Sequence, residues 1–284
     1  MNSALSSKLQ LADRSLAAEI REHYNNFAWL YRRFWGDHIH HGLFWHGNES
    51  PEEAQLQMLA HCSELAAIQK NWRVLDVGCG HGGTCVYLAN KYGCETTGIT
   101  ISDRQGELCH ENAERAKITA EFIIADVEEL EFPVAVFDAI WTMEACEHFL
   151  DKPKYFRKAA RALRPDGVLL LSAWTGSMVS ARVRRVAEEF LCPELLTAGE
   201  YSAVVREAGL TILKNEDLTQ KVIPTWQICR RRARAASALL KFLPPHVMRF
   251  VEAMEVILEA YRAGELRYTV LVAQRNTQNC AVHS

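Results

Sequence analysis

An apolar segment that runs into a glycine-rich turn constrains the fold more than any other part of the chain. Residues 72–77 are apolar or β-branched apart from Arg73 and Asp76, and a helical pattern begins at Thr84. The turn between them holds Gly78, Gly80, Gly82 and Gly83. This order predicts a strand, a tight turn and a helix N-terminus, where a ligand can lie against bare backbone. The unpaired N–H groups of the first helical turn favour an anionic group there.

Strands and helices alternate along the rest of the chain. The patterns predict strands near 72–77, 95–100, 121–125, 136–141, 168–173, 210–215 and 267–273. They predict helices near 52–65, 84–91, 103–116, 152–163, 199–208, 229–243 and 247–261. Such alternation is typical of a doubly wound, Rossmann-like α/β sheet that is mostly parallel and covered on both faces.

The same patterns divide the chain into one elaborated domain. We expect a helical lid segment over 1–70, a cofactor-binding core over 71–218, a helical cap insertion over 219–264, a last core strand over 265–275 and a tail over 276–284. A length of 284 residues is enough for a full hydrophobic core.

Composition excludes several classes of function. A hydrophobic content of 49% and a net charge of -3 are ordinary for a globular protein and give no reason to expect nucleic acid or a membrane surface. The first 20 residues have no apolar core of a signal peptide, and no run is long enough for a membrane helix. Nine scattered cysteines without a CxxC pair favour reduced thiols and a cytoplasmic location.

Two ligand classes compete for the glycine turn. Gly78, Gly80 and Gly83 match the GxGxxG pattern of dinucleotide-binding enzymes, which expects an acid at the end of the second strand. That strand ends at Thr100 instead, and Asp76 precedes the glycines, where it could bind an amine. Backbone N–H groups beside a carboxylate suit an amino-acid zwitterion, such as that of S-adenosylmethionine. An NAD(P)-dependent oxidoreductase and a non-catalytic cofactor-binding protein remain the alternatives.

Five segments in order resemble the motifs of class I S-adenosylmethionine-dependent methyltransferases. They are 74–80, 98–105, 122–127, 137–148 and 163–169. The second of these and the block at 34–45 resemble tocopherol C-methyltransferase-like enzymes and the related cyclopropane synthases most. The resemblance implies seven strands with the seventh antiparallel, a lid built from the N-terminus and the insertion, and S-adenosyl-L-methionine as the cofactor.

The resemblance also assigns cofactor-binding residues. They are Tyr24, Asp76, Gly78, Cys79, Gly80, Gly82, Thr100, Ile101, Gln105, Asp126, Val127 and Glu144. Asp76 and Asp126 would otherwise be turn formers at strand ends. The three histidines His38, His40 and His41 lack the carboxylate or thiolate partners of a zinc site, so we expect no metal.

The loop after the fourth strand carries the candidate catalytic groups. Glu144, Glu147 and His148 follow that strand at the sheet edge where open α/β sheets bind ligands, and His41 joins them from the lid. A general base there could take the acceptor's proton. The structural alternative is that Glu147 caps a helix and His148 packs beneath the cofactor. The predicted substrate pocket holds Trp35, His40, Trp45, Trp174 and Trp226.

The expected acceptor is a bulky, mostly apolar small molecule that is methylated at carbon or nitrogen. Ser172 stands where cyclopropane synthases carry a histidine, and His41 lies near the place of their lid cysteine, which favours plain methyl transfer over cyclopropanation. The arginine run at 230–234 is either a solvated helix face or a contact for an acidic group of the acceptor. A homodimer is compatible with the sequence.

Overall fold

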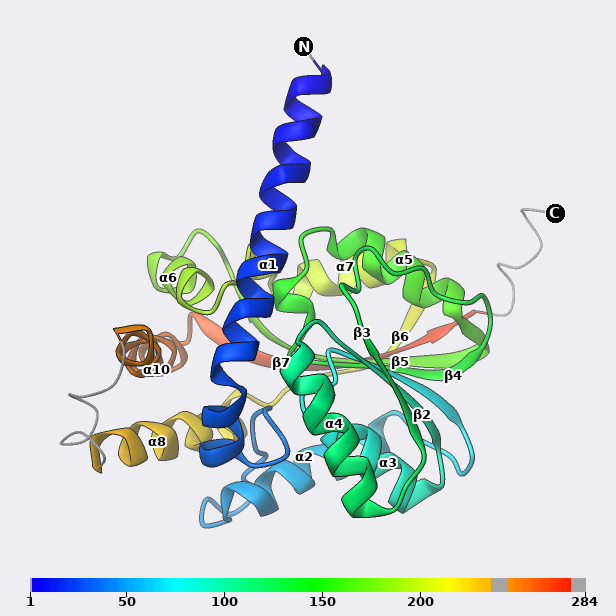
Figure 1. Ribbon diagram of the computed structural model, residues 1–284, viewed down its shortest axis with the longest axis horizontal. Coiled ribbons are helices and arrows are strands. Elements are labelled where there is room, and N and C mark those ends of the chain that lie inside the picture. Colours follow the sequence, from blue (N-terminus) through cyan, green and yellow to red (C-terminus); the bar gives the residue numbers. More distant parts are fainter. Residues whose placement is uncertain (1, 236–244, 277–284) are drawn as a thin grey trace.

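A seven-stranded sheet forms the centre of the computed structural model, which describes residues 2–235 and 245–276. The strand order is β3-β2-β1-β4-β5-β7-β6 (Figure 1). The strands are β1 (Arg73–Val77), β2 (Glu95–Thr100), β3 (Ala120–Ile124), β4 (Phe137–Met143), β5 (Leu163–Gly176), β6 (Leu210–Asp217) and β7 (Leu266–Arg275). Strands β1 to β5 pair in parallel, and β7 runs antiparallel to both β5 and β6. The predicted fold class is confirmed.

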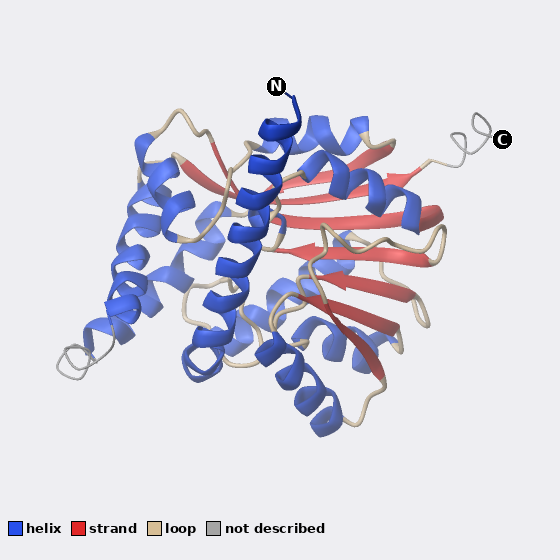
Figure 2. Cartoon of the chain, turned by 45° about the horizontal axis from the view of Figure 1, so that its top comes forward, coloured by secondary structure: helices blue, strands red, loops and turns tan. Residues whose placement is uncertain are grey.

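Helices cover both faces of the sheet (Figure 2). The crossover helices are α3 (Gly83–Tyr92), α4 (Asp103–Ala116), α5 (Lys152–Ala162) and α7 (Ala198–Glu207). Alternate strand residues feed separate cores, because successive side chains point to opposite faces. Val74 and Trp141 belong to one buried cluster, whereas Leu75 and Ile140 belong to the other, together with residues of α5 and α7.

The remaining helices lie at the carboxyl edge and one end of the sheet. They are α1 (Asn2–Trp35), α2 (Pro51–Leu65), α6 (Ala181–Glu189), α8 (Thr219–Ala235) and α10 (Pro245–Arg262). In Figure 1, α1 crosses in front of the sheet, and α6, α8 and α10 gather beside the end of β7. Helix α8 begins ten residues before the helix predicted over 229–243, and the end of that prediction falls outside the described residues.

Local sequence explains where these elements begin. The Ser50 hydroxyl accepts a hydrogen bond from the Glu53 N–H while the Glu53 carboxylate accepts one from the Ser50 N–H, so a capping box starts α2. Strand β5 starts five residues earlier than predicted because Leu163 already pairs with Phe137, and the register shifts before Val168 meets Ala139. Within the described ranges, no helix is both long and apolar enough to span a membrane.

Candidate active site

A cavity lies where the strand order reverses between β1 and β4, the position at which open α/β sheets bind ligands. The turns after β1, β2, β3 and β4 supply one part of its wall. Helix α1, the loop at 36–42, Trp174 near the end of β5, the residues after α6 and the middle of α8 supply the other part. The cavity therefore joins the predicted cofactor residues to the predicted lid and cap.

Two positions of the turn after β1, Gly78 and Gly80, have no room for a side chain. A Cβ atom on Gly78 would lie 2.3 Å from the Cβ of Ala145, and one on Gly80 would lie 2.8 Å from Ile39 Cδ1. Both glycines also have positive φ angles, of 75° and 53°. Their backbone is therefore the surface that lines the cavity, where a ligand can approach it closely.

Asp76 lies at the end of β1 with its carboxyl group in the cavity wall. Burial raises its pKa to about 7, and its one hydrogen-bond partner in the described structure is the weakly donating thiol of Cys85, 3.6 Å away. A buried carboxylate with such a weak donor is destabilised unless a cation approaches it. The environment of Asp76 fits the amino group of S-adenosylmethionine.

The end of β2 presents an oriented but incompletely bonded amide. Thr100 Oγ1 donates to Gln105 Oε1 over 2.7 Å, which fixes the orientation of the amide. Gln105 Nε2 is buried without a hydrogen-bond partner in the described structure, and both residues line the cavity. An unpaired donor at this place fits a ribose hydroxyl. Ile101, Asp126 and Val127 extend the same wall.

Glu144 ties the lid to the sheet. It follows β4 in a left-handed conformation (φ 51°) and accepts hydrogen bonds from the backbone N–H and Nδ1 of His41, at 2.8 and 2.7 Å. Trp174 Nε1 and the Tyr268 hydroxyl also donate to it, at 3.2 and 2.7 Å. Burial alone would raise the pKa of Glu144, but the interactions with His41, including two hydrogen bonds, outweigh it and bring that pKa to about 2.

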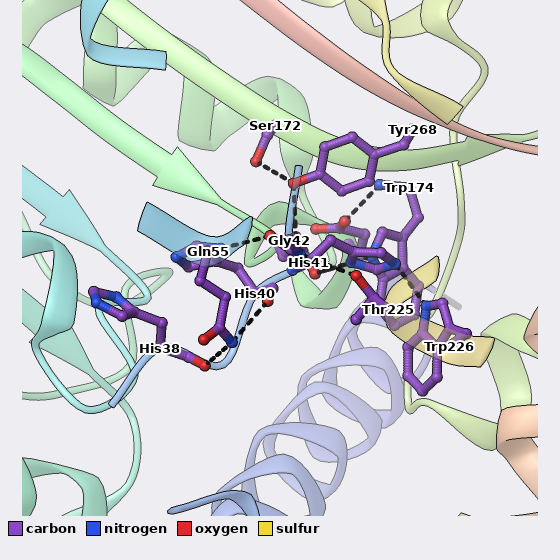
Figure 3. Close-up of polar contacts among 12 residues, drawn as sticks. His38, His40, His41, Gly42, Gln55, Ser172, Trp174, Thr225, Trp226 and Tyr268 are labelled. Atoms are coloured by element: carbon purple, nitrogen blue, oxygen red, sulfur yellow. Dashed lines mark hydrogen bonds and ion pairs between the residues drawn. The ribbon is translucent and has the colours of Figure 1, made fainter. Parts of the chain in front are cut away.

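Both nitrogens of His41 are engaged (Figure 3). Trp226 Nε1, which can only donate, lies 2.6 Å from His41 Nε2, so Nε2 carries the lone pair and Nδ1 carries the proton given to Glu144. Beside it, the Gly42 N–H donates to Thr225 Oγ1 of α8. The bonds made by His41 and Gly42 hold the lid loop between the sheet and α8.

Glu147 and His148 lie on a short 3-10 turn, Cys146–His148, next to the cavity. The Trp174 N–H donates to Glu147 Oε1 over 2.7 Å, and burial raises the pKa of Glu147 to about 8. His148 Nδ1 donates to the Leu191 carbonyl, so its Nε2 accepts from the Tyr24 hydroxyl over 2.9 Å. Burial lowers the pKa of His148 to about 4, which keeps the ring neutral.

Most predicted site residues line this cavity, but two do not. Trp45 is half-exposed, because the chain turns outward after Phe44, and its ring packs edge-on against His61 and under Lys221. The prediction that Trp45 is in the substrate pocket is therefore wrong. Gly82 is the N-cap of α3, faces Phe122 and Cys109 and lies outside the lining.

The other clusters singled out in the sequence lie away from the cavity. Arg230 and Arg234 both form ion pairs with Glu255 of α10, at 3.3 and 2.9 Å. In the part of the chain that the structure describes, no group of three or more histidine, cysteine or acidic side chains is arranged to hold a metal ion.

Several site residues could not be found from the sequence. Tyr268 reaches Glu144 from the middle of β7, where a tyrosine looks like any other strand residue. Phe190 and Cys192 follow α6 and enter the cavity wall, and Leu191 between them holds His148 through its carbonyl. The only local indication is the left-handed conformation of Leu191, which a sequence pattern does not show.

The chain resembles known proteins over most of its length. The model of the family described as mycolic acid cyclopropane synthetase matches residues 12–274. The chain is 31% identical to the 27-O-demethylrifamycin SV methyltransferase of Amycolatopsis mediterranei, covering 90% of this chain and 97% of that protein. It is 27% identical to the chloroplastic tocopherol O-methyltransferase of Arabidopsis thaliana, covering 92% and 83%. A mycolic acid cyclopropane synthase solved with SAH and CTAB superposes with a TM-score of 0.83 at 21% identity, covering 91% and 98%.

Proposed function

The chain belongs to the mycolic acid cyclopropane synthetase family and is an S-adenosylmethionine-dependent methyltransferase, and from this premise we propose that it methylates a bulky, largely apolar small molecule. One observation carries the proposal. The cavity that contains Asp76 and Gln105 continues without interruption to an aromatic wall formed by Trp35, Trp174 and Trp226. Nothing among the relatives favours the oxidoreductase alternative.

The cofactor supplies a sulfonium-bound methyl group that is already activated for transfer. Asp76 would accept a hydrogen bond from the amino group of its methionine part, the backbone at Gly78 and Gly80 would lie against that part, and Gln105 Nε2 would donate to a ribose hydroxyl. Asp126 and Val127 would border the adenine, and Tyr24 would close the site from α1. Holding an acceptor in line with the methyl group supplies about 7–11 kcal/mol of the barrier.

Glu147 is the proposed general base. Its pKa of about 8 is close to the value that a base needs near neutral pH, whereas Glu144 has four donors and His41 has both ring nitrogens occupied. We assign Glu144 and His41 to positioning the lid. As the acceptor's O–H, N–H or C–H bond breaks, its proton goes to Glu147. The Tyr24 hydroxyl, bonded to neutral His148, orients the acceptor.

Plain methyl transfer remains the favoured reaction. Ser172 is bonded to the Tyr268 hydroxyl at 3.1 Å, and the imidazole of His41 fills the space between Glu144 and Trp226. The resemblance favours carbon or nitrogen as the methylated atom, while two relatives are named for methyl groups on oxygen. The arginine run gives no support for a diphosphate acceptor, since it lies outside the cavity lining.

A screen with S-adenosylmethionine labelled in its methyl group tests the proposal. Apolar phenols, hydroquinones, macrolides and alkaloids would be offered beside small hydrophilic amines, and NMR of the product would identify the methylated atom. We expect turnover only among the apolar compounds. Turnover confined to the hydrophilic amines would contradict the apolar pocket.

Location and assembly stay predictions. All eight cysteines in the described ranges are free thiols, which supports a reducing compartment such as the cytoplasm. A homodimer and the absence of nucleic-acid binding are predicted from the sequence alone.

A further inference from the structure

Apart from histidines, tyrosines and cysteines, the ionisable side chains that line the cavity in the described ranges are all carboxyl groups. Within the described ranges, six carboxyl groups contribute to the lining and no lysine or arginine does. The six belong to Asp37, Asp76, Asp126, Glu128, Glu144 and Glu147. Asp37 forms an ion pair with Arg115, but in the described ranges the other five form no ion pair with a lysine or an arginine; Glu144 alone pairs with the imidazole of His41.

Two buried lysines donate to backbone carbonyls of residues in the cavity wall. Lys152 Nζ donates to the carbonyl of Phe149 at 2.8 Å, and Lys158 Nζ donates to the carbonyls of Val127 and Leu130 at 2.6 and 2.9 Å. Both lysines are buried and neither lines the cavity. Their charges stabilise the turns behind the site, so an anion inside the cavity would have no cation to bind.

Several polar atoms in the part of the cavity next to the methyl acceptor are available to accept a hydrogen bond. His40 Nδ1 donates to the His41 carbonyl at 2.8 Å, and burial lowers the pKa of His40, so its buried Nε2 is a lone pair without a partner in the described structure. The Tyr24 hydroxyl donates a hydrogen bond to His148, so the lone pairs of its oxygen remain available to another donor. Glu147 Oε2, which is a hydrogen-bond acceptor once the carboxyl group has lost its proton, has only the Cys146 thiol near it, at 3.8 Å.

We propose that the methyl acceptor presents an uncharged or cationic head group that donates hydrogen bonds, such as a hydroxyl or an amine, and that carboxylate and phosphate head groups are excluded. This inference rests on the proposed function and narrows its substrate class. A wall of carboxyl groups repels an anion, and buried acceptor atoms are left unsatisfied by a head group that has no proton to give.

Calorimetry with three probes that share the same apolar tail measures how the charge of the head group affects binding. The protein, saturated with S-adenosylhomocysteine, would be titrated at low salt and pH 9, where Glu147 is ionised, with para-hexylphenol, para-hexylbenzylamine and para-hexylbenzoate. We expect the phenol and the amine to bind, and the benzoate to bind at least about 100-fold more weakly. Benzoate binding as tight as that of the phenol would overturn the inference and leave the apolar pocket intact.

Two matched variants each add one positive charge, the first at the cavity rim and the second away from it. Leu150 lines the cavity and is 41% exposed, while Leu213 lies on β6 away from it and is 48% exposed. Leu150→Lys should tighten benzoate binding about threefold, as expected for an exposed charge, and Leu213→Lys should change nothing. An equal gain in both variants would contradict the charge argument. If no probe binds although S-adenosylhomocysteine does, the apolar-acceptor function fails and this inference fails with it.

Discussion

At the scale of single residues, the site separates two neighbouring carboxyl groups by their surroundings. Glu144 has four protein donors and a pKa of about 2, while Glu147 is buried with one N–H donor and a pKa of about 8. Two carboxyls whose pKa values are pushed apart in this way are suited to different roles. The sequence placed both on the loop after β4, but it could not distinguish them, because Tyr268 and Trp174 reach Glu144 from distant strands.

The first prediction concerns Glu147. A base must lose its proton before it can act, so kcat/KM should rise as the pH increases from 6 towards 8 and level off above the pKa of about 8. His148 stays neutral over that range and should not contribute. Glu147→Gln should lower turnover by about 10²–10⁴-fold and remove the rise. The control is Glu95→Gln, an exposed carboxylate at the start of β2. A rise that survives in Glu147→Gln would assign the base elsewhere.

The second prediction concerns Asp76. Asp76→Asn removes the charge that faces the cofactor's amino group, so the affinity for S-adenosylhomocysteine should fall by about 1.5–3 kcal/mol in calorimetry. Asp138→Asn is the matched control, because Asp138 lies near the opposite end of β4, pairs with Arg164 and does not line the cavity. An unchanged dissociation constant for Asp76→Asn would reduce its role to capping the turn.

At the scale of elements, the lid loop depends on one side chain of α2. Gln55 Nε2 donates to the carbonyls of His38 and His40, at 2.5 and 3.4 Å (Figure 3). Both Gln55 and His40 are buried, so water cannot easily replace these bonds.

Gln55→Leu should therefore destabilise the protein by about 1–3 kcal/mol and speed hydrogen exchange in the lid loop, as mass spectrometry would report. Gln57→Leu is the control on the same helix, because Gln57 Oε1 is buried without a partner in the described structure and its loss costs little. Equal exchange in the two variants would show that the lid is held by other contacts.

The sequence predicted the positions of helices and strands correctly where the apolar periodicity is strong. It missed elements where this periodicity is weak. Strands β1, β2 and β4 are buried runs, and their predicted positions agree with the structure within two residues. Helix α6 was not predicted, because only Val183, Val186 and Ala187 of its nine residues are buried and the rest of the segment is polar. Helix α1 spans Asn2–Trp35 within the predicted helical lid segment, although no helix bounds were predicted there.

At the scale of the whole molecule, buried titrating groups set the dependence of stability on pH. The imidazoles with pKa values lowered by burial are those of His38, His40, His81 and His148. The carboxyls with raised pKa values are those of Asp76 and Glu147. The two sets have opposite effects on the free energy of unfolding. The imidazoles bind protons more tightly in the unfolded state, whereas these carboxyls bind protons more tightly in the folded state.

The signs predict a maximum of stability near pH 6.5–7. As the pH falls from 9, the two carboxyls take up protons in the folded state alone, and the free energy of unfolding rises. Below the unfolded histidine pKa of about 6.5, the four imidazoles take up protons in the unfolded state alone and outnumber the carboxyls, so stability falls. Thermal unfolding between pH 5 and 9 would measure this curve. A midpoint temperature that keeps rising below pH 6 would contradict it.

The division of the cavity between two sets of segments bears on how its specificity changes over generations. The cofactor half is formed by turns of the sheet, where the close approach of Gly78 to Ala145 leaves no room for substitution. The aromatic half comes largely from α1, the stretch after α6 and α8, which lie outside the sheet. Mutations in those segments can reshape the pocket for a new natural product while the methyl donor continues to be held, so descendants of one ancestral gene can diverge in product without losing the reaction.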